Sequence, residues 1–288
     1  MLKNDNIFIN FLTDLLQNFN KILRGKNEKF CIIQIKNVKE GGICMKIVHI
    51  SDLHVSGYNF VEKWGNSLIK MVNSLNPDLI LVTGDLTDDG YIYEYEKACS
   101  FLERFSCKNK IVVPGNHDAR NEGYLIFEKI FGTRFPFYQN GKLAILGLDS
   151  TEPDIDDGHI GRENYALIRE KLKNFEIKIL MLHHHLIPIP GTGRERNIPV
   201  DAGDVLKICA EEKINFVLSG HKHLPWLWKL ENTYFITAGT ATSFRLKGYS
   251  YPSFNFLEIE KGSFSLTIFN VEKEREEEKF KRSLKIPK

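Results

Sequence analysis

The sequence predicts an α/β fold, because short apolar runs alternate with amphipathic segments from residue 45 onward. Residues 46–50, 79–83 and 110–113 have the length and apolar content of buried strands. Helical spacing separates them over 61–75, where Asn76-Pro77 ends the pattern, and over 91–105. Repeated strand–helix units of this kind predict right-handed crossovers and a mostly parallel sheet.

The second half continues the alternation and then changes character. Strands are predicted at 143–148, 177–182 and 216–219, with helices at 163–172 and 203–212. Residues 226–230, 234–238, 255–260 and 263–269 read as consecutive strands joined by turns, which indicates an antiparallel sheet. We expect one domain over 45–271, and we expect the highly charged segment 272–288 to be a solvated C-terminal tail.

Composition narrows the class of protein. A hydrophobic content of 42% and a charged content of 26% are ordinary for a soluble domain. The net charge of +2 does not by itself indicate a nucleic-acid partner, and no apolar run reaches the ~18 residues of a membrane span. The five cysteines are odd in number and form no C-x-x-C pair, which favours reduced thiols in a cytoplasmic protein.

Residues 1–44 form an N-terminal extension with two interpretations. Apolar side chains from Phe8 to Leu23 recur at helical spacing, which predicts an amphipathic helix that docks on a partner or second subunit. Alternatively, translation begins at Met45 and the segment is upstream read-through, because codons for Glu40-Gly41-Gly42 can contain a ribosome-binding sequence at a suitable distance. We favour the start at Met45.

Polar side chains follow the ends of five predicted strands. Each group alone has an ordinary explanation as a turn. If all of these imidazoles and carboxylates were buried without partners, however, they would cost the folded protein several kcal/mol. Metal coordination would supply the missing partners. The groups are Asp52 and His54, Asp85, Asn116 and His117, His183 to His185, and His221 and His223.

This order of motifs resembles the calcineurin-like metallophosphoesterase superfamily over residues 45–270. Segments 84–90 and 115–120 look closest to its bacterial cyclic-nucleotide and glycerophosphodiester phosphodiesterase branch. That branch usually has His-His-Pro-Pro where this chain has His183-His184-His185-Leu186, which puts the shape of the substrate entrance in doubt. The resemblance implies a four-layer αββα sandwich with mixed sheets.

The resemblance also implies two metal sites. One would be held by Asp52, His54 and His223, the other by Asn116, His183 and His221, with Asp85 bridging them. Mixed nitrogen and oxygen ligands suit two divalent ions such as Mn, Fe or Zn. A closed structural zinc site would use thiolates, and no cysteine is near these motifs.

The expected chemistry is attack by a metal-bridging hydroxide, with His117 protonating the leaving oxygen and Asp118 orienting its imidazole. His184 and His185 are interpreted either as substrate contacts or as packed histidines. Arginines are candidates to grip phosphate, although each alone could be a solvated surface charge. These are Arg120, Arg194, Arg196 and Arg245.

We therefore predict an enzyme, a metal-dependent phosphodiesterase acting on a cyclic nucleotide or similar small phosphorylated substrate. The alternatives are a nucleotide phosphomonoesterase or pyrophosphatase, a nuclease, and a non-catalytic binding scaffold on the same fold. No basic stripe with interleaved aromatic residues supports a nucleic-acid partner.

Overall fold

The computed structural model of the chain describes residues 44–193 and 197–284. All of them belong to one compact unit, Ile33–Lys288. The expected N-terminal extension, apart from Cys44, and the candidates Arg194 and Arg196 lie outside the described residues. None of the described helices is long and apolar enough to cross a membrane.

The first sheet has six strands in the order β12-β11-β10-β1-β2-β3. Its strands β1, β2 and β3 are parallel, as the strand–helix alternation predicts, and β10 pairs antiparallel with β1. Each of the first three has a largely apolar, buried run, which is typical of a strand covered on both faces. The bounds are β1 Met45–Ile50, β2 Leu79–Thr83, β3 Lys110–Val113, β10 Ser253–Glu260, β11 Ser263–Asn270 and β12 Arg275–Ser283.

The second sheet has the order β4-β5-β6-β7-β9-β8. Strands β5, β6, β7 and β9 are parallel, and antiparallel β4 and β8 form its two edges. The bounds are β4 Phe137–Asn140, β5 Leu143–Gly147, β6 Ile177–Met181, β7 Phe216–Ser219, β8 Trp226–Leu230 and β9 Thr233–Thr237.

The expected antiparallel sheet of four consecutive strands is wrong. β8 and β9 belong to the second sheet, whereas β10 and β11 cross to the first. The first sheet is therefore parallel over β1–β3 and antiparallel over β10–β12, and the second has a parallel centre with antiparallel edges. The physical reason is that an apolar run identifies a buried strand without identifying its neighbour. Pairing here is decided by the packing of two sheets against each other.

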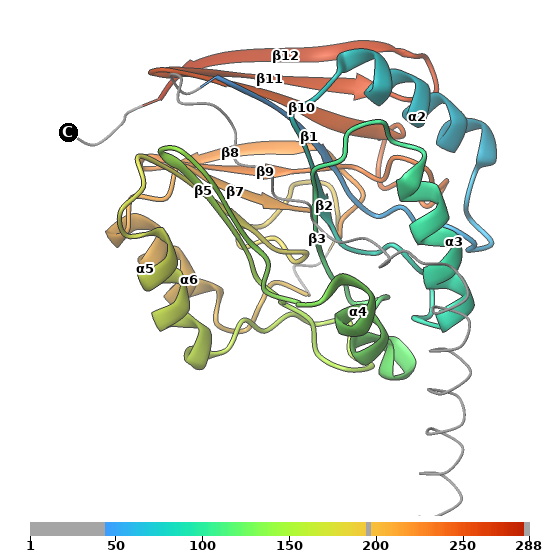
Figure 1. Cartoon of the computed structure of the whole chain (residues 1–288), viewed down its shortest axis with the longest axis horizontal. Coiled ribbons are helices and arrows are strands. Elements are labelled where there is room, and N and C mark those ends of the chain that lie inside the picture. Colours follow the sequence, from blue (N-terminus) through green and yellow to red (C-terminus); the bar gives the residue numbers. More distant parts are fainter. Residues whose placement is uncertain (1–43, 194–196, 285–288) are drawn as a thin grey trace, which may run out of the picture. The chain divides into compact units, whose positions relative to one another are not determined.

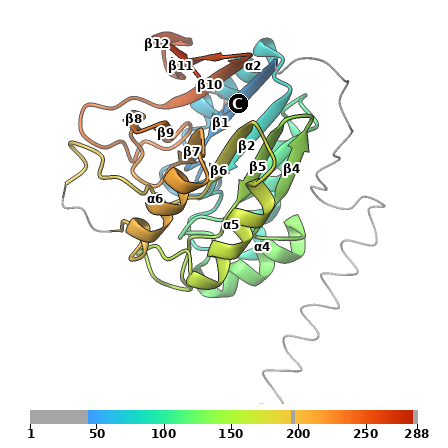
Figure 2. The ribbon, with the colours of Figure 1, turned by 90° about the vertical axis from the view of Figure 1, so that its left-hand side faces the viewer.

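Helices cover the outer faces of the two sheets (Figures 1 and 2). α2 (Glu62–Leu75) and α3 (Ile92–Glu103) lie beside the first sheet, and α5 (Tyr165–Leu172) and α6 (Ala202–Glu211) cover the second. Between the sheets, Ile47 and Leu81 pack in one cluster with Ile179 and Leu218, while Leu180 packs on the helix side of the second sheet. The layers are therefore αββα. The remaining helices are α4 Gly123–Phe131 and two short 3-10 helices, Arg120–Glu122 and Arg162–Asn164.

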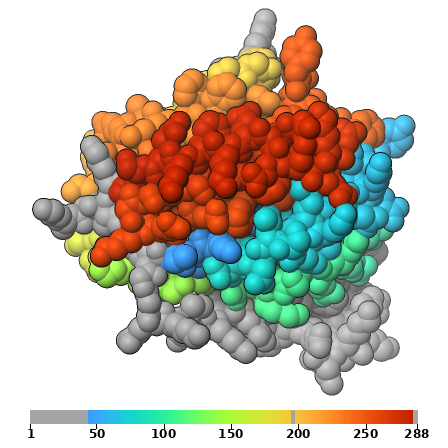
Figure 3. Space-filling model, turned by 90° about the horizontal axis from the view of Figure 1, so that it is seen from above, coloured from blue at the N-terminus to red at the C-terminus, as the bar shows by residue number. Residues whose placement is uncertain are grey.

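The charged C-terminal segment is not a solvated tail over Arg275–Ser283. These residues form β12, which pairs antiparallel with β11 at the edge of the first sheet, and the red C-terminal strands cross the face seen in Figure 3. Phe280 packs against the core cluster, while most of the strand is exposed. A charged edge strand is a common defence against pairing with other chains, and its lack of apolar alternation hides it from sequence patterns.

Candidate metal centre

The candidate site lies where parallel strands of both sheets end. Asp52 and His54 follow β1, Asp85 follows β2, and His117 lies in the loop after β3. His183 follows β6 of the second sheet. The carboxyl ends of parallel strands therefore bring together groups that are more than a hundred residues apart, as predicted. The other members of the site are Asn116, His221 and His223.

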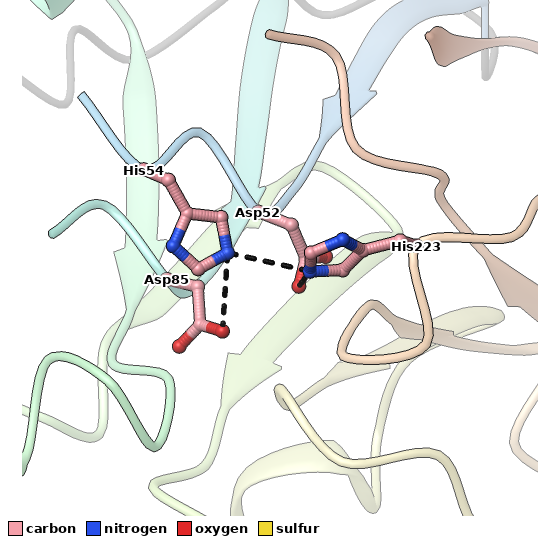
Figure 4. Close-up of side chains that lie close together, drawn as sticks. All are labelled: Asp52, His54, Asp85 and His223. Atoms are coloured by element: carbon pink, nitrogen blue, oxygen red, sulfur yellow. Dashed lines mark hydrogen bonds and ion pairs between the residues drawn. The ribbon is translucent and has the colours of Figure 1, made fainter. Parts of the chain in front are cut away.

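Four of these side chains form a first cluster, drawn in Figure 4. His54 Nε2 lies 3.3 Å from His223 Nε2 and 3.7 Å from Asp85 Oδ2. His223 Nε2 lies 3.2 Å from Asp52 Oδ1. One ligand atom from each residue falls within 4.8 Å of all the others. All four side chains are buried, so the cluster is a compact polar centre inside an apolar fold.

A second cluster adjoins the first. Asn116 Oδ1 lies 3.0 Å from His183 Nε2 and 3.0 Å from His221 Nδ1, and the two ring nitrogens are 3.2 Å apart. Asp85 Oδ2 lies 3.4 Å from His183 Nε2. The same oxygen of Asp85 therefore faces imidazoles of both clusters.

The imidazoles are oriented for coordination. His54 Nδ1 donates to Asp88 Oδ1 at 2.6 Å, and His183 Nδ1 donates to the Thr83 carbonyl at 2.7 Å. His223 Nδ1 donates to the Arg245 carbonyl at 2.6 Å. Because these oxygens accept, the hydrogen is assigned to Nδ1 and the Nε2 lone pair points into the site. Lone pairs that face each other across 3.3 Å call for a cation between them.

The charges of the site lead to the same conclusion. Burial alone would raise the pKa of Asp85, but the imidazoles of His183, His117 and His54 lower it well below its usual value. Burial opposes a charged His183, yet Asp85 and Asp52 raise the pKa of its imidazole to about 9. The two buried carboxylates thus attract positive charge. With nitrogen and oxygen donors, the residues fit borderline divalent cations such as Mn, Fe or Zn.

The backbone at the site is strained. Five of the predicted ligands adopt positive φ angles, a conformation that costs a residue with a side chain about 1–2 kcal/mol. Glycine is required beside them, because a Cβ on Gly115 would lie 2.2 Å from Asp85 Oδ1 and one on Gly220 would lie 1.8 Å from Ser51 Oγ. The five are Asp52 (53°), His54 (45°), Asp85 (52°), His221 (72°) and His223 (54°).

His117 lies beside the first cluster, with its ring edge-on to that of His54 at 4.8 Å between centroids. Its Nδ1 lies 2.6 Å from the Asp88 carbonyl oxygen and 2.9 Å from Arg120 Nη1. Arg120 also pairs with Asp156, Nη2 to Oδ1, at 2.8 Å. The structure therefore places Arg120 at the site, as the prediction of a phosphate contact requires, but already in an ion pair.

The prediction that Asp118 orients His117 is wrong. The carboxylate accepts hydrogen bonds from the backbone N–H groups of Leu86, Thr87 and Gly115, at 2.9–3.1 Å, and from the Thr87 hydroxyl. Burial and the charge of Asp85 raise its pKa to about 6. Asp118 instead ties the loop after β2 to the loop after β3. Adjacency in sequence suggested a side-chain pair, but the backbone turn sends the two side chains apart.

Of the two interpretations of His184, the structure supports the packed histidine. This residue is fully buried, and its Nδ1 and Nε2 lie 2.9 Å from Ser150 Oγ and 3.1 Å from the Asp156 carbonyl oxygen. Both ring nitrogens are therefore used inside the protein, as in the packed interpretation. His185, adjacent to it, is buried too.

The sequence did not predict two residues of the site, Asp88 and Asp156. Asp88 holds His54, and Asp156 accepts a hydrogen bond from Asn116 Nδ2 at 2.9 Å. Asp88 does lie three residues beyond Asp85 in the same loop, which is the available signal. A run of Asp and Gly is also an ordinary turn, so nothing in the sequence pairs either residue with its partner.

Comparisons with known proteins agree with this geometry. A family model described as calcineurin-like phosphoesterase matches residues 45–225. A "probable cyclic nucleotide phosphodiesterase" of Xenorhabdus bovienii is 28% identical over 207 residues, which is 65% of this chain and 82% of that protein.

Two further similarities extend the comparison. A "probable glycerophosphodiester phosphodiesterase" of Arcobacter nitrofigilis is 29% identical over 160 residues, 49% of this chain and 57% of that protein. The structure of a purple acid phosphatase from yellow lupin superimposes with a TM-score of 0.68 at 14% identity, covering 85% of this chain and 54% of that one. This chain thus spans just over half the length of these two proteins.

Proposed function

The chain belongs to the calcineurin-like phosphoesterase family and is a metal-dependent phosphoester hydrolase, and we propose that it holds two divalent cations and hydrolyses a small phosphodiester, a cyclic nucleotide or a similar compound. The observation that carries the proposal is the position of Asp85. Its Oδ2 faces His54 at 3.7 Å and His183 at 3.4 Å, one imidazole from each cluster.

The proposed ligands follow from the two clusters. Asp52, His54 and His223 would hold one cation, and Asn116, His183 and His221 the other, with Asp85 bridging. When bound, two divalent cations would act as Lewis acids on the phosphoryl oxygens and lower the pKa of a water molecule between them toward about 7. Asp52 and Asp85 contribute two negative charges, so the loaded site would keep about two positive charges for an anionic phosphoryl group.

His117 would serve as the general acid. Its Nδ1 lies 2.6 Å from the Asp88 carbonyl oxygen, which would accept the Nδ1 hydrogen of the protonated ring. Nε2 is then the atom that would deliver a proton to the leaving oxygen. His117 is largely buried and its ring lies edge-on to His54, so it would be next to the proposed ligands when a leaving group departs.

The preference for a diester is supported by the two relatives, whose names describe diester substrates. The test is a panel of paired monoesters and diesters with the same leaving group, assayed with Mn, Zn, Fe and Mg in turn. We expect faster turnover of the diester, full loss on chelation, and recovery on adding back one of the first three metals. Faster turnover of the monoester would contradict the substrate class, and activity that survives complete metal removal would contradict the metal site.

A further inference from the structure

Two loops that are far apart in sequence are joined at the rim of the first cluster. Residues 51–61 follow β1 and include His54, whereas residues 238–252 lie between β9 and β10. Phe244 N donates to the Asn59 carbonyl at 3.0 Å, and Val61 N donates to the Thr242 carbonyl at 2.7 Å. These backbone hydrogen bonds fix the two loops against each other, so the side chains that they carry are held in a defined arrangement.

The joined loops present two aromatic rings to solvent. Tyr58 is 92% exposed and Phe244 is 51% exposed. Their rings meet edge to face, with 6.4 Å between centroids and 70° between planes. This arrangement leaves both faces of one ring uncovered by the other. Single exposed apolar side chains need no explanation. Tyr58 and Phe244, however, are held together by the joined loops, and their exposed rings offer a surface on which a planar group can stack.

The neighbour of each ring in the sequence either contacts or itself provides a group that holds a proposed ligand. Tyr58 follows Gly57, whose backbone packs so closely on Asp88 that a Cβ would lie 1.9 Å from Asp88 Oδ2, and Asp88 holds His54. Phe244 precedes Arg245, whose carbonyl holds His223. The backbone that carries the aromatic pair is therefore adjacent in sequence to residues that contact the supports of His54 and His223.

Positive charge accompanies the rings. Arg245 directly follows Phe244, is exposed, and accepts a hydrogen bond from His223 Nδ1 through its carbonyl at 2.6 Å. A cation and an exposed ring pair next to a phosphoryl site match a substrate that carries both a planar ring and an anionic phosphate.

We propose that Tyr58 and Phe244 form a stacking subsite for a planar aromatic group of the substrate, a nucleobase, and so determine which phosphodiesters the site selects. This inference rests on the proposed function for its catalytic consequence. Stacking of one base on protein aromatics typically changes affinity about 5- to 150-fold on alanine substitution. Neither Tyr58 nor Phe244 is among the proposed metal ligands. Their substitution should therefore change substrate binding and not the rate of the chemical step.

The test compares two probes that differ by the base alone, adenosine 5′-monophosphate and ribose 5-phosphate, bound to the manganese-loaded full chain in calorimetry. We expect the wild type to bind the nucleotide about 5- to 150-fold more tightly, and Tyr58→Ser/Phe244→Ser to remove that difference. The affinity for ribose 5-phosphate should not change, which also verifies that the variant is folded. Tyr249→Ser is the matched control, because Tyr249 is fully exposed on the same loop and should retain wild-type selectivity.

Equal affinity of the wild type for the two probes would overturn the subsite, as would a nucleotide preference that survives in the double variant. In kinetics, the double variant should raise KM for a cyclic nucleotide and leave KM for glycerophosphoethanolamine, a diester without a ring, unchanged. An equal rise for both diesters would also overturn the proposal. If the chain hydrolysed no diester at all, the proposed function would fail, while the calorimetric comparison would still decide whether the rings bind a base.

Discussion

Asp88→Ala should weaken metal binding without changing the acid role of His117. The carboxylate is 17% exposed and lies 2.6 Å from His54 Nδ1, a short, charge-assisted hydrogen bond. It fixes the ring so that Nε2 faces the cluster. Removing such a partner of a metal-bound histidine typically lowers metal affinity about 10- to 100-fold, or about 1.4–2.7 kcal/mol. Only the cation that His54 would bind should be affected.

The contact with His117 is made by the backbone carbonyl of Asp88, at 2.6 Å, and this carbonyl is still present in the alanine variant. The rate ratio between poor and good leaving groups should therefore equal that of the wild type when the metals are saturating. Two substitutions at one loop thus separate two roles: Asp88→Ala acts on metal binding and His117→Ala acts on proton transfer.

Calorimetric titration of the metal-free chain with Mn or Zn measures the effect directly. Asp89→Ala is the matched control, because it removes the same charge at the next position. Asp89 is 54% exposed and lies 3.6 Å from Arg120, and it belongs to neither ligand cluster. If Asp88→Ala bound both ions as tightly as Asp89→Ala does, the carboxylate would not be a support for His54, and the reasoning from this hydrogen bond would be refuted.

Three further outcomes follow from the site. His117→Ala should bind metal normally but lose about 10²–10⁴ in rate on poor leaving groups, and less on a nitrophenyl diester; an equal loss on both would reject a general acid. Asp118→Asn should lower the free energy of unfolding by about 1–3 kcal/mol, because an amide cannot accept from every donor that the carboxylate holds. The dependence of the hydrolysis rate on the leaving group should stay unchanged. A changed dependence would support the prediction that Asp118 orients His117. Gly115→Ala should be destabilised by about 1–3 kcal/mol and lose metal, because its Cβ would lie 2.4 Å from the Asp85 backbone nitrogen; a wild-type melting temperature and metal content would contradict the close packing.

The proposed ligands were predictable because they obey a local rule. Each follows an apolar run that ends at a turn, and parallel strands bring such ends together whatever the exact pairing. Asp52, Asp85 and His183 could therefore be grouped before any strand order was known. Glycine at position 115 belongs to the same signal, since only a residue without a Cβ allows the loop to approach Asp85.

The remaining features depend on contacts that no local pattern records. Asp88 is placed on His54 by the turn of its loop, and Asp118 reaches the backbone at Leu86 across 32 residues. In the same way, β10 pairs with β1 of the first sheet and not with β9, its neighbour in the sequence. β12 carries charge on an exposed edge, where apolar alternation is not required.

The claim that one carboxylate serves two cations is tested most directly by counting metal in Asp85→Asn. Metal content measured by mass spectrometry after equilibration with Mn or Zn should be two ions per chain for the wild type. His54→Ala should lose mainly one of them, whereas Asp85→Asn should lose both, because Asp85 Oδ2 faces His54 and His183 at once. An Asp85→Asn protein that retained two ions and full turnover would contradict the account.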